Sequence, residues 1–167
     1  ARQVSRMEPP RITVIGLTGL PEITPGMDLA SLLVAAAEQA AGRLRKGDVV
    51  ALSSKVLSKS LGLRAPTGAR REDLVRAEST RVVVERARAD GSVGRVVEAV
   101  AGPVMMAAGV DASNTGPEPD LLLLPRDPDA AARDLREQLR QRTGVRHLGL
   151  LVTDTAGRPW RAGVTDF

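Results

Sequence analysis

The order in which strand-like and helix-like patterns follow one another places the chain in a fold class. Apolar runs typical of buried strands lie at residues 12–15, 48–53, 96–100, 104–108, 121–124 and 147–152. In some places a helical pattern separates two such runs, whereas in others one run follows another directly. This mixture favours an α+β or mixed α/β fold, with a mixed sheet and flanking helices, over a regular parallel winding.

Two segments carry both the cap residues and the periodicity of helices. Asp28 is a good N-cap for a helix over residues 29–45, in which apolar side chains recur every three or four positions, and Gly47 ends it. The segment Asp127-Pro128-Asp129 opens the second helix, because an N-cap acid, an early proline and a further acid suit a helix start. Gly144 is the natural C-cap of this second helix.

Other parts of the chain give weaker patterns. Residues 71–90 are predicted to be mainly helical, although β-branched side chains within positions 80–84 oppose that state. Residues 63–70 are rich in Gly, Pro and Arg and are expected to be mobile. Residues 1–10 are polar and are expected to form a flexible N-terminal arm, which leaves residues 11–167 for the folded part.

Composition narrows the range of functions. The chain has one Trp, one Phe and no Tyr, so its core must use Val, Leu, Ile and Ala, and it lacks the aromatic platforms on which single-stranded nucleic acids stack. The net charge of +4 comes from arginines interleaved with acids, as on a solvated surface, so no nucleic acid is expected as a partner. The absence of Cys excludes a thiolate metal site. No run is long enough to cross a bilayer, and we expect a soluble, cytoplasmic protein.

Two acidic loops stand at the ends of apolar runs. One is Gly109-Val110-Asp111-Ala112-Ser113-Asn114, and the other contains Asp154 and Thr155. Two carboxylates and a hydroxyl at one edge of a sheet would suit Mg²⁺ or Mn²⁺, which also take ligands from water and from nucleotide phosphates. Local roles remain open for both acids: an Asx-turn for Asp111 and a cap of the following turn for Asp154.

A serine- and lysine-rich segment follows the apolar run at residues 48–53. Ser54, Lys55 and Lys59 offer hydroxyl and ammonium groups that, with backbone N–H groups, would hold phosphate. The flanking glycines of a Walker A loop are missing, however. On local grounds a capped helix turn with exposed lysines is the favoured interpretation.

Two further segments are open to both a functional and a local interpretation. Arg158 and Arg161 flank the only Trp, and they form either an anion clamp beside the metal or a tight turn in which Trp160 fills the core. Residues 19–23 indicate only a rigid turn on local grounds.

Five stretches, taken together and in order, resemble the coenzyme F-420 γ-glutamyl ligase family (coenzyme F420-0:L-glutamate ligase, the CofE-like domain). They are residues 19–26, 47–50 with 53–59, 108–114, 123–129, and 152–155 through 157–161. Any one of these stretches is a weak signal, but five in register over nearly the whole chain are a strong one.

The resemblance implies a ligase of coenzyme F-420 biosynthesis that depends on GTP and a divalent metal. Such an enzyme joins L-glutamate through its amine to the carboxylate of a deazaflavin precursor, through an acyl phosphate, and releases GDP and phosphate. Positioning and charge neutralisation supply most of the catalysis in such steps. The resemblance further implies small-molecule substrates only and a homodimer.

Carried over by position, the family's site residues fall into two sets. The resemblance implies metal ligands at Asp111, Asp154 and Thr155. It implies GTP contacts at Leu20, Pro21, Glu22, Ile23, Ser54, Lys55, Lys59 and Asn114. On physical grounds we add Arg158 and Arg161 as catalytic clamps for a phosphate or for the substrate carboxylate.

The chain departs from the family's pattern in two places. Residues 64–103 match it poorly, and the family's domain continues beyond Phe167 with another nucleotide-contacting loop and a further metal ligand. Residues 11–167 are therefore expected to be the N-terminal portion of such a domain, stopping after a turn at residues 163–166. The alternative is a non-catalytic nucleotide- and metal-binding fragment or a divergent homologue, in which binding survives without turnover.

Overall fold

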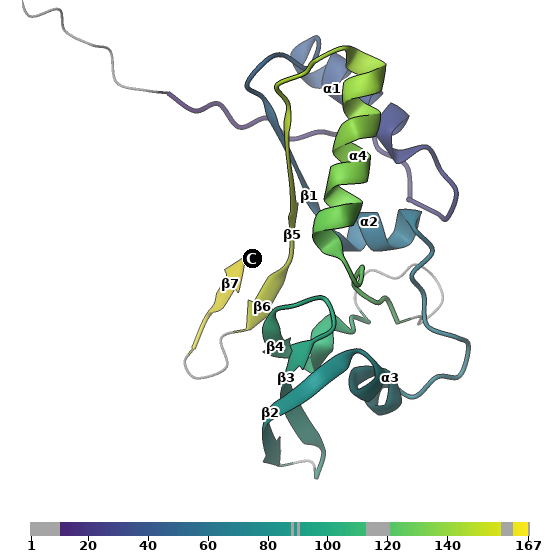
Figure 1. Ribbon diagram of the computed structural model, residues 1–167, viewed down its shortest axis with the longest axis vertical. Coiled ribbons are helices and arrows are strands. Elements are labelled where there is room, and N and C mark those ends of the chain that lie inside the picture. Colours follow the sequence, from purple (N-terminus) through teal and green to yellow (C-terminus); the bar gives the residue numbers. More distant parts are fainter. Residues whose placement is uncertain (1–10, 88, 90, 113–120, 158–161, 167) are drawn as a thin grey trace, which may run out of the picture.

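The computed structural model is elongated, with two lobes stacked along its long axis (Figure 1). It describes residues 11–87, 89, 91–112, 121–157 and 162–166. Each lobe has its own cluster of buried apolar side chains. The chain begins the upper lobe, leaves it to build the lower one, and then returns to complete the upper lobe.

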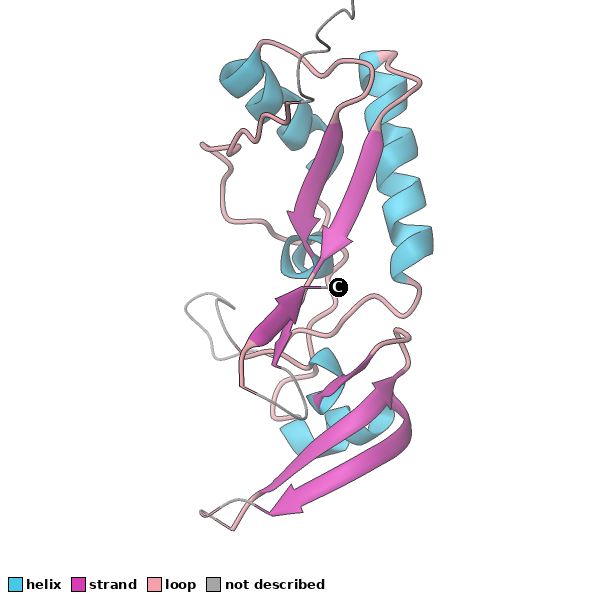
Figure 2. Ribbon diagram, turned by 90° about the vertical axis from the view of Figure 1, so that its left-hand side faces the viewer, coloured by secondary structure: helices cyan, strands magenta, loops and turns pink. Residues whose placement is uncertain are grey.

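The upper lobe consists of a parallel strand pair with two helices on one face. Strands β1 (Val49–Ser53) and β5 (Gly149–Thr153) pair in register from end to end. Helices α1 (Leu29–Ala41) and α4 (Pro128–Thr143) lie behind the two strands in Figure 2. Their contact with the strands buries a core of Leu29, Leu33, Val50, Leu52, Leu135, Leu139 and Leu148.

The lower lobe is a three-stranded antiparallel sheet with one short helix, α3 (Arg71–Ala77). The sheet has the order β2-β3-β4, formed by β2 (Ser79–Ala87), β3 (Val93–Ala99) and β4 (Val104–Met106). A short 3₁₀ turn, η1 (Ala107–Gly109), follows β4. The core of this lobe consists of Val75, Val97, Ala99, Met105, Ala108 and Val110.

Three connections form the junction between the lobes. Helix α2 (Ser54–Ser60) begins where β1 ends, and the hairpin of β6 (Thr155–Gly157) and β7 (Val164–Asp166) follows β5. Two chain segments that run between the lobes bond to each other, since Ala65 N–H donates to Leu121 O (2.8 Å) and Leu123 N–H donates to Leu63 O (2.9 Å). Backbone hydrogen bonds therefore hold the junction together. Residues 63–70, which were expected to be mobile, take part in these bonds.

The starts of both predicted helices are confirmed by their caps. The Asp28 carboxylate accepts from Ser31 N–H at 3.0 Å, and the Asp127 carboxylate accepts from Ala130 N–H at 2.7 Å. The predicted end of α1 at residue 45 is wrong, because Gly42 adopts a φ of +81° and ends the helix there. Within the described part of the chain, no helix is long and apolar enough to cross a membrane.

The prediction of a mainly helical segment at residues 71–90 is wrong beyond Ala77. From Ser79 the chain becomes β2 and pairs with β3 along the whole strand. The β-branched residues that opposed the helical pattern fit a pleated strand better than a helix. Pairing with a strand later in the chain therefore decides the state of this segment.

Three shorter predictions also need correction. Residues 12–15 form no strand, and Ile12 and Val14 are 91% and 90% exposed, because no neighbouring strand pairs with them in the described structure. Residues 121–124 contribute only isolated bridges at Leu122, to Arg64 and Asp111. The predicted turn at residues 163–166 contains β7 instead.

Candidate functional site at the lobe junction

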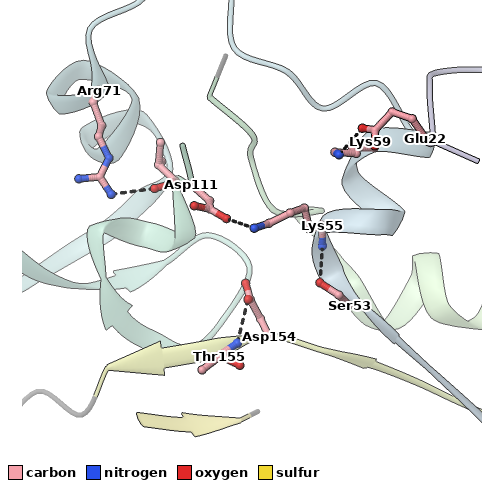
Figure 3. Close-up of polar contacts among 9 residues, drawn as sticks. Glu22, Ser53, Lys55, Lys59, Arg71, Asp111, Asp154 and Thr155 are labelled. Carbon is pink, nitrogen blue, oxygen red and sulfur yellow. Dashed lines mark hydrogen bonds and ion pairs between the residues drawn. The ribbon is translucent and has the colours of Figure 1, made fainter. Parts of the chain in front are cut away.

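Side chains from three distant segments meet where the lobes join (Figure 3). Lys55 Nζ lies 2.6 Å from Asp111 Oδ2, and the Asp154 carboxylate points towards this pair. These groups border a small cavity, called the acidic cavity below, which is lined by Ser54, Lys55, Ser58, Gly109, Asp111, Leu122, Leu123, Leu124 and Asp154. The structure thus brings the two predicted acidic loops to one place.

The backbone before Asp111 is held in an unusual conformation. Ala107, Ala108 and Gly109 have φ angles of +53°, +52° and +71°, in the left-handed region that costs an L-residue about 1–2 kcal/mol. The buried side chains of Ala108 and Val110 anchor this turn in the lower core. The surrounding packing therefore stabilises a turn that places Asp111 at the edge of the lower lobe.

Two neighbouring segments fix the Asp111 backbone further. Asp111 N–H donates to Leu122 O at 3.1 Å, and Leu122 N–H donates to Asp111 O at 2.8 Å. From α3, Arg71 Nη2 donates to the carbonyl oxygen of Val110 at 2.9 Å. No motif in the sequence indicated Arg71, since a single arginine in a helical pattern carries no signal of a partner so far along the chain.

Asp154 and Thr155 stand at the end of β5. Asp154 Oδ1 accepts from the adjacent Thr155 N–H at 2.8 Å, and the carboxylate also borders the acidic cavity. The segment that follows is strand β6 and not the turn of the local alternative. The Thr155 hydroxyl donates to Asp166 Oδ1 at 2.6 Å and so links β6 to β7. Asp166 is a further acid near the site that no motif in the sequence indicated.

Helix α2 carries the predicted phosphate contacts and has a serine cap. Ser53 Oγ accepts from Lys55 N–H at 3.3 Å, so the expectation of a capped helix turn is confirmed. The expectation that its lysines are exposed is wrong, because Lys59 is only 7% exposed. Lys59 Nζ donates to the Glu22 carboxylate, and this hydrogen bond, with the lysine charge, lowers the pKa of Glu22.

The loop at residues 20–23 therefore lies against the end of α2. Ile23 is buried in the upper core and Leu20 packs partly against it, whereas Pro21 and Glu22 are exposed. The first and last residues of this stretch thus anchor it, and the two between them are accessible. The contact between Glu22 and Lys59 joins two of the predicted GTP-contacting segments.

Comparison with known proteins decides the family to which the chain belongs. The family model described as F420-0:Gamma-glutamyl ligase matches residues 18–167. The chain belongs to this ligase family. The match covers both lobes and every described residue of the acidic cavity.

Curated relatives of the ligase family carry the name coenzyme F420:L-glutamate ligase. The chain is 34% identical to the protein of Haloarcula marismortui, over 90% of this chain and 63% of the relative. It is 38% identical to that of Methanopyrus kandleri, over 86% and 59%, and 37% identical to that of Archaeoglobus fulgidus, over 94% and 65%. The chain therefore spans less than two thirds of the length of these relatives.

Three of the predicted site residues lie outside the described residues. They are Asn114, Arg158 and Arg161. Of the other predicted contacts, Ser54, Lys55, Asp111 and Asp154 border the acidic cavity. Lys59 of α2 bonds to Glu22, and Leu20 and Ile23 pack against the upper core. Their roles stay predictions, while their proximity is a feature of the structure.

The oxygen atoms that border the acidic cavity suit a hard divalent cation only if ligands from outside the chain complete its coordination shell. Two carboxylates, of Asp111 and Asp154, border it, and the Thr155 hydroxyl is turned to Asp166. Within the described ranges, no group of three or more His, Cys, Asp or Glu side chains is placed to hold a metal ion. A Mg²⁺ or Mn²⁺ ion bound here would complete its shell with water and nucleotide phosphates, as such ions commonly do.

Proposed function

We propose that this chain forms the nucleotide- and metal-binding part of a GTP-dependent ligase. The ligase adds L-glutamate to a coenzyme F420 precursor through a γ-glutamyl amide bond. One observation carries the proposal: Lys55, Asp111 and Asp154 come from three segments far apart in the sequence and border one cavity. The names of the curated relatives support the substrate and the product.

The proposed reaction has two steps. A carboxylate oxygen of the precursor attacks the γ-phosphorus of GTP, and GDP leaves. The glutamate amine then attacks the carbonyl carbon of the acyl phosphate; phosphate leaves, and the nitrogen loses a proton as the amide forms. Both steps build negative charge on phosphate oxygens, so positioned cations lower the barrier.

The residues at the junction have chemistry that fits these needs. Lys55 supplies a compact positive charge for phosphate oxygens, and its present partner Asp111 holds it at the cavity. Lys59 and the loop at residues 20–23 bind the nucleotide from the upper lobe in this scheme. Arg158 and Arg161 act as clamps for phosphate or for the substrate carboxylate.

In this proposal Asp111 and Asp154 hold the divalent cation, with Thr155 beside them. The chemistry of the donors fits, because carboxylate and hydroxyl oxygens are ligands that Mg²⁺ and Mn²⁺ accept. When bound, the cation supplies charge neutralisation to the phosphates of the nucleotide.

Calorimetric titration of GTP in the presence of Mn²⁺ tests whether the chain binds the nucleotide and the metal together. We expect binding that requires the metal and that disappears in Asp154→Ala. Asp73→Ala, an exposed acid on α3 that lines neither the acidic cavity nor the large cavity beside it, is the matched control and keeps binding. Metal-independent binding, or an equal loss in both variants, would contradict the proposed site.

A second candidate is a nucleotide- and metal-binding module without turnover. It is favoured by one observation, that the chain spans only 59–65% of the length of the three relatives named above. Mass spectrometry of the precursor after incubation with GTP, Mn²⁺ and L-glutamate separates the two. A glutamate-sized mass increase supports the ligase, whereas GTP binding without any product supports the module.

The homodimer is a proposal as well, and the uncovered face of the upper sheet supports it. Parallel strands are normally buried on both faces, yet Val49 and Leu151, on the face away from α1 and α4, are 58% and 55% exposed. In this proposal the face packs against a second copy. Light scattering tests this: we expect a dimeric mass for the wild type and a monomeric mass for Val49→Arg.

A further inference from the structure

A second and larger cavity lies beside the acidic cavity, between the lobes. Its volume is about 640 Å³, within the size range of small-molecule sites. The upper lobe contributes the end of β5 and the first turn of α4, and the lower lobe contributes the turn at residues 100–103. Because both lobes line it, this interlobe cavity exists only when they are docked.

The interlobe cavity opens onto the site described above. Ser54, Leu124 and Asp154 line both it and the acidic cavity. One side of the interlobe cavity therefore adjoins the cavity that Lys55 and Asp111 border. Lys59 and Glu22 line neither cavity, so the loop at residues 20–23 approaches the site from elsewhere.

The lining of the interlobe cavity is mostly apolar and is poor in available positive charge. Apolar residues line most of it, among them Val100, Pro103, Leu124, Pro125, Leu150 and Val152. Its one described cation, Arg126, is paired with Glu78 at 2.9 Å, and three aspartates also border the cavity. A triphosphate, with its several negative charges, would meet repulsion here, whereas the face of an aromatic ring can pack against the apolar lining.

From this arrangement we infer that the interlobe cavity holds the deazaflavin ring of the acceptor, with the reactive carboxylate directed to Lys55 at the acidic cavity. This inference rests on the proposed function and adds the place of its acceptor. The nucleotide and the acceptor then enter from different sides of α2. In this scheme the reacting carboxylate and phosphate meet beside Lys55, at the boundary of the two cavities.

Narrowing the cavity from α4 tests the inference without touching the acidic cavity. Ala132 lines the interlobe cavity, and Ala132→Leu adds apolar bulk inside it. Ala130 lies on the same helix and lines neither cavity, so Ala130→Leu is the matched control. Both variants are first compared with the wild type by urea unfolding, and a smaller change, Ala132→Val, replaces Ala132→Leu if the latter does not fold.

The measurement is a titration of coenzyme F420, followed by the fluorescence anisotropy of its deazaflavin ring, beside a titration of GTP with Mn²⁺. We expect Ala132→Leu to weaken coenzyme binding by about tenfold or more. Ala130→Leu should leave it unchanged, and both variants should bind GTP like the wild type.

The possible outcomes separate this inference from the proposed function. Equal coenzyme binding by the wild type and Ala132→Leu would overturn the acceptor cavity and leave the ligase proposal intact. A folded wild type that binds GTP but not coenzyme F420 would also overturn the acceptor cavity. Failure of the wild type to bind either molecule would overturn both.

Discussion

Lys55 Nζ lies 2.6 Å from Asp111 Oδ2, although the two residues are held by different lobes. Lys55 belongs to α2, whose Leu57 is buried in the upper core, whereas Asp111 directly follows Val110 of the lower core. The ion pair is therefore a contact across the junction. A substrate that binds Lys55 in place of Asp111 would therefore break this ion pair between the lobes.

The first prediction is that this pair contributes little to stability and much to binding. The two side chains are 23% and 39% exposed, and exposed pairs contribute about 0.2–1 kcal/mol. In a double-mutant cycle of Lys55→Met and Asp111→Asn, we expect urea unfolding to give a coupling free energy in that range. Each single variant should bind GTP with Mn²⁺ at least about tenfold more weakly, since a hydrogen bond to a charged group contributes about 1.5–3 kcal/mol. A large coupling with unchanged GTP affinity would show a purely structural pair.

The second prediction concerns Gly109, which has a φ of +71° beneath Leu124. A Cβ at this position would lie 2.7 Å from Cγ of Leu124, and closer still to its Cδ1. We expect Gly109→Ala to lower the free energy of unfolding by about 2–4 kcal/mol, through left-handed strain and overpacking together. Urea denaturation measures this change.

Two variants separate strain from overpacking at Gly109. Gly102 also has a positive φ, of +109°, but a Cβ there meets nothing within 4 Å, so Gly102→Ala reports strain alone. Adding Leu124→Ala to Gly109→Ala removes the clashing group and should recover part of the loss. An equal effect of Gly102→Ala and Gly109→Ala would mean that the close approach of Leu124 is unimportant.

The third prediction is a pH dependence from Asp28. Hydrogen bonds from Arg142 and from Ser31 lower the pKa of Asp28 from 3.8 to about 2. Because the folded pKa lies below the unfolded one, this stabilisation is complete above pH 4 and is lost as the pH falls towards 2. We expect the difference in urea midpoint between the wild type and Asp28→Ala to be constant from pH 7 to pH 5 and to shrink between pH 4 and pH 2.5.

Arg142→Met provides the matched test of the cause. This substitution removes the hydrogen bond from the Arg142 guanidinium group to Asp28, and it leaves the N-cap bond from Ser31 N–H to Asp28. The pH-dependent part of the stability difference should be smaller in this background. An unchanged pH profile would mean that the guanidinium group does not lower the pKa of Asp28.

The fourth prediction concerns the buried Lys59. Its ammonium group donates to Glu22, whose side chain is 63% exposed. Glu22→Gln leaves a buried cation without its counter-charge, whereas Lys59→Met removes the cation and keeps an apolar stem of similar size. Thermal unfolding should therefore show a greater loss of stability for Glu22→Gln than for Lys59→Met. The reverse order would show that the carboxylate matters little to the lysine.

Local chemistry explains which parts of the fold could be predicted. Asp28 and Asp127 cap their helices with side chains that reach only three residues ahead, so the sequence contains all the partners. The state of residues 79–87 depends instead on β3, a strand that lies later in the chain. Periodicity within the segment carries no information about that partner.

The same limit applies to the site. The proximity of Asp111 and Asp154 followed from their places at the ends of apolar runs, and the structure places both at the acidic cavity. The burial of Lys59 depends on Glu22, and the position of Asp111 depends on a left-handed turn at two alanines. Alanine has no preference for that conformation, so packing of the folded lobe decides it.

The register of β1 with β5 has a consequence for the order of folding. Val49 pairs with Gly149, so the upper core must close a loop that contains the entire lower lobe, and such closure is entropically costly and slow. The hairpins of the lower lobe join neighbouring strands and carry no such delay. We expect Lys55 and Asp111 to be synthesised and the lower lobe to fold while Asp154 is still absent from the nascent chain. The junction then becomes competent to bind only when the last strand of the upper lobe docks, which makes site assembly a late step in the folding of the protein.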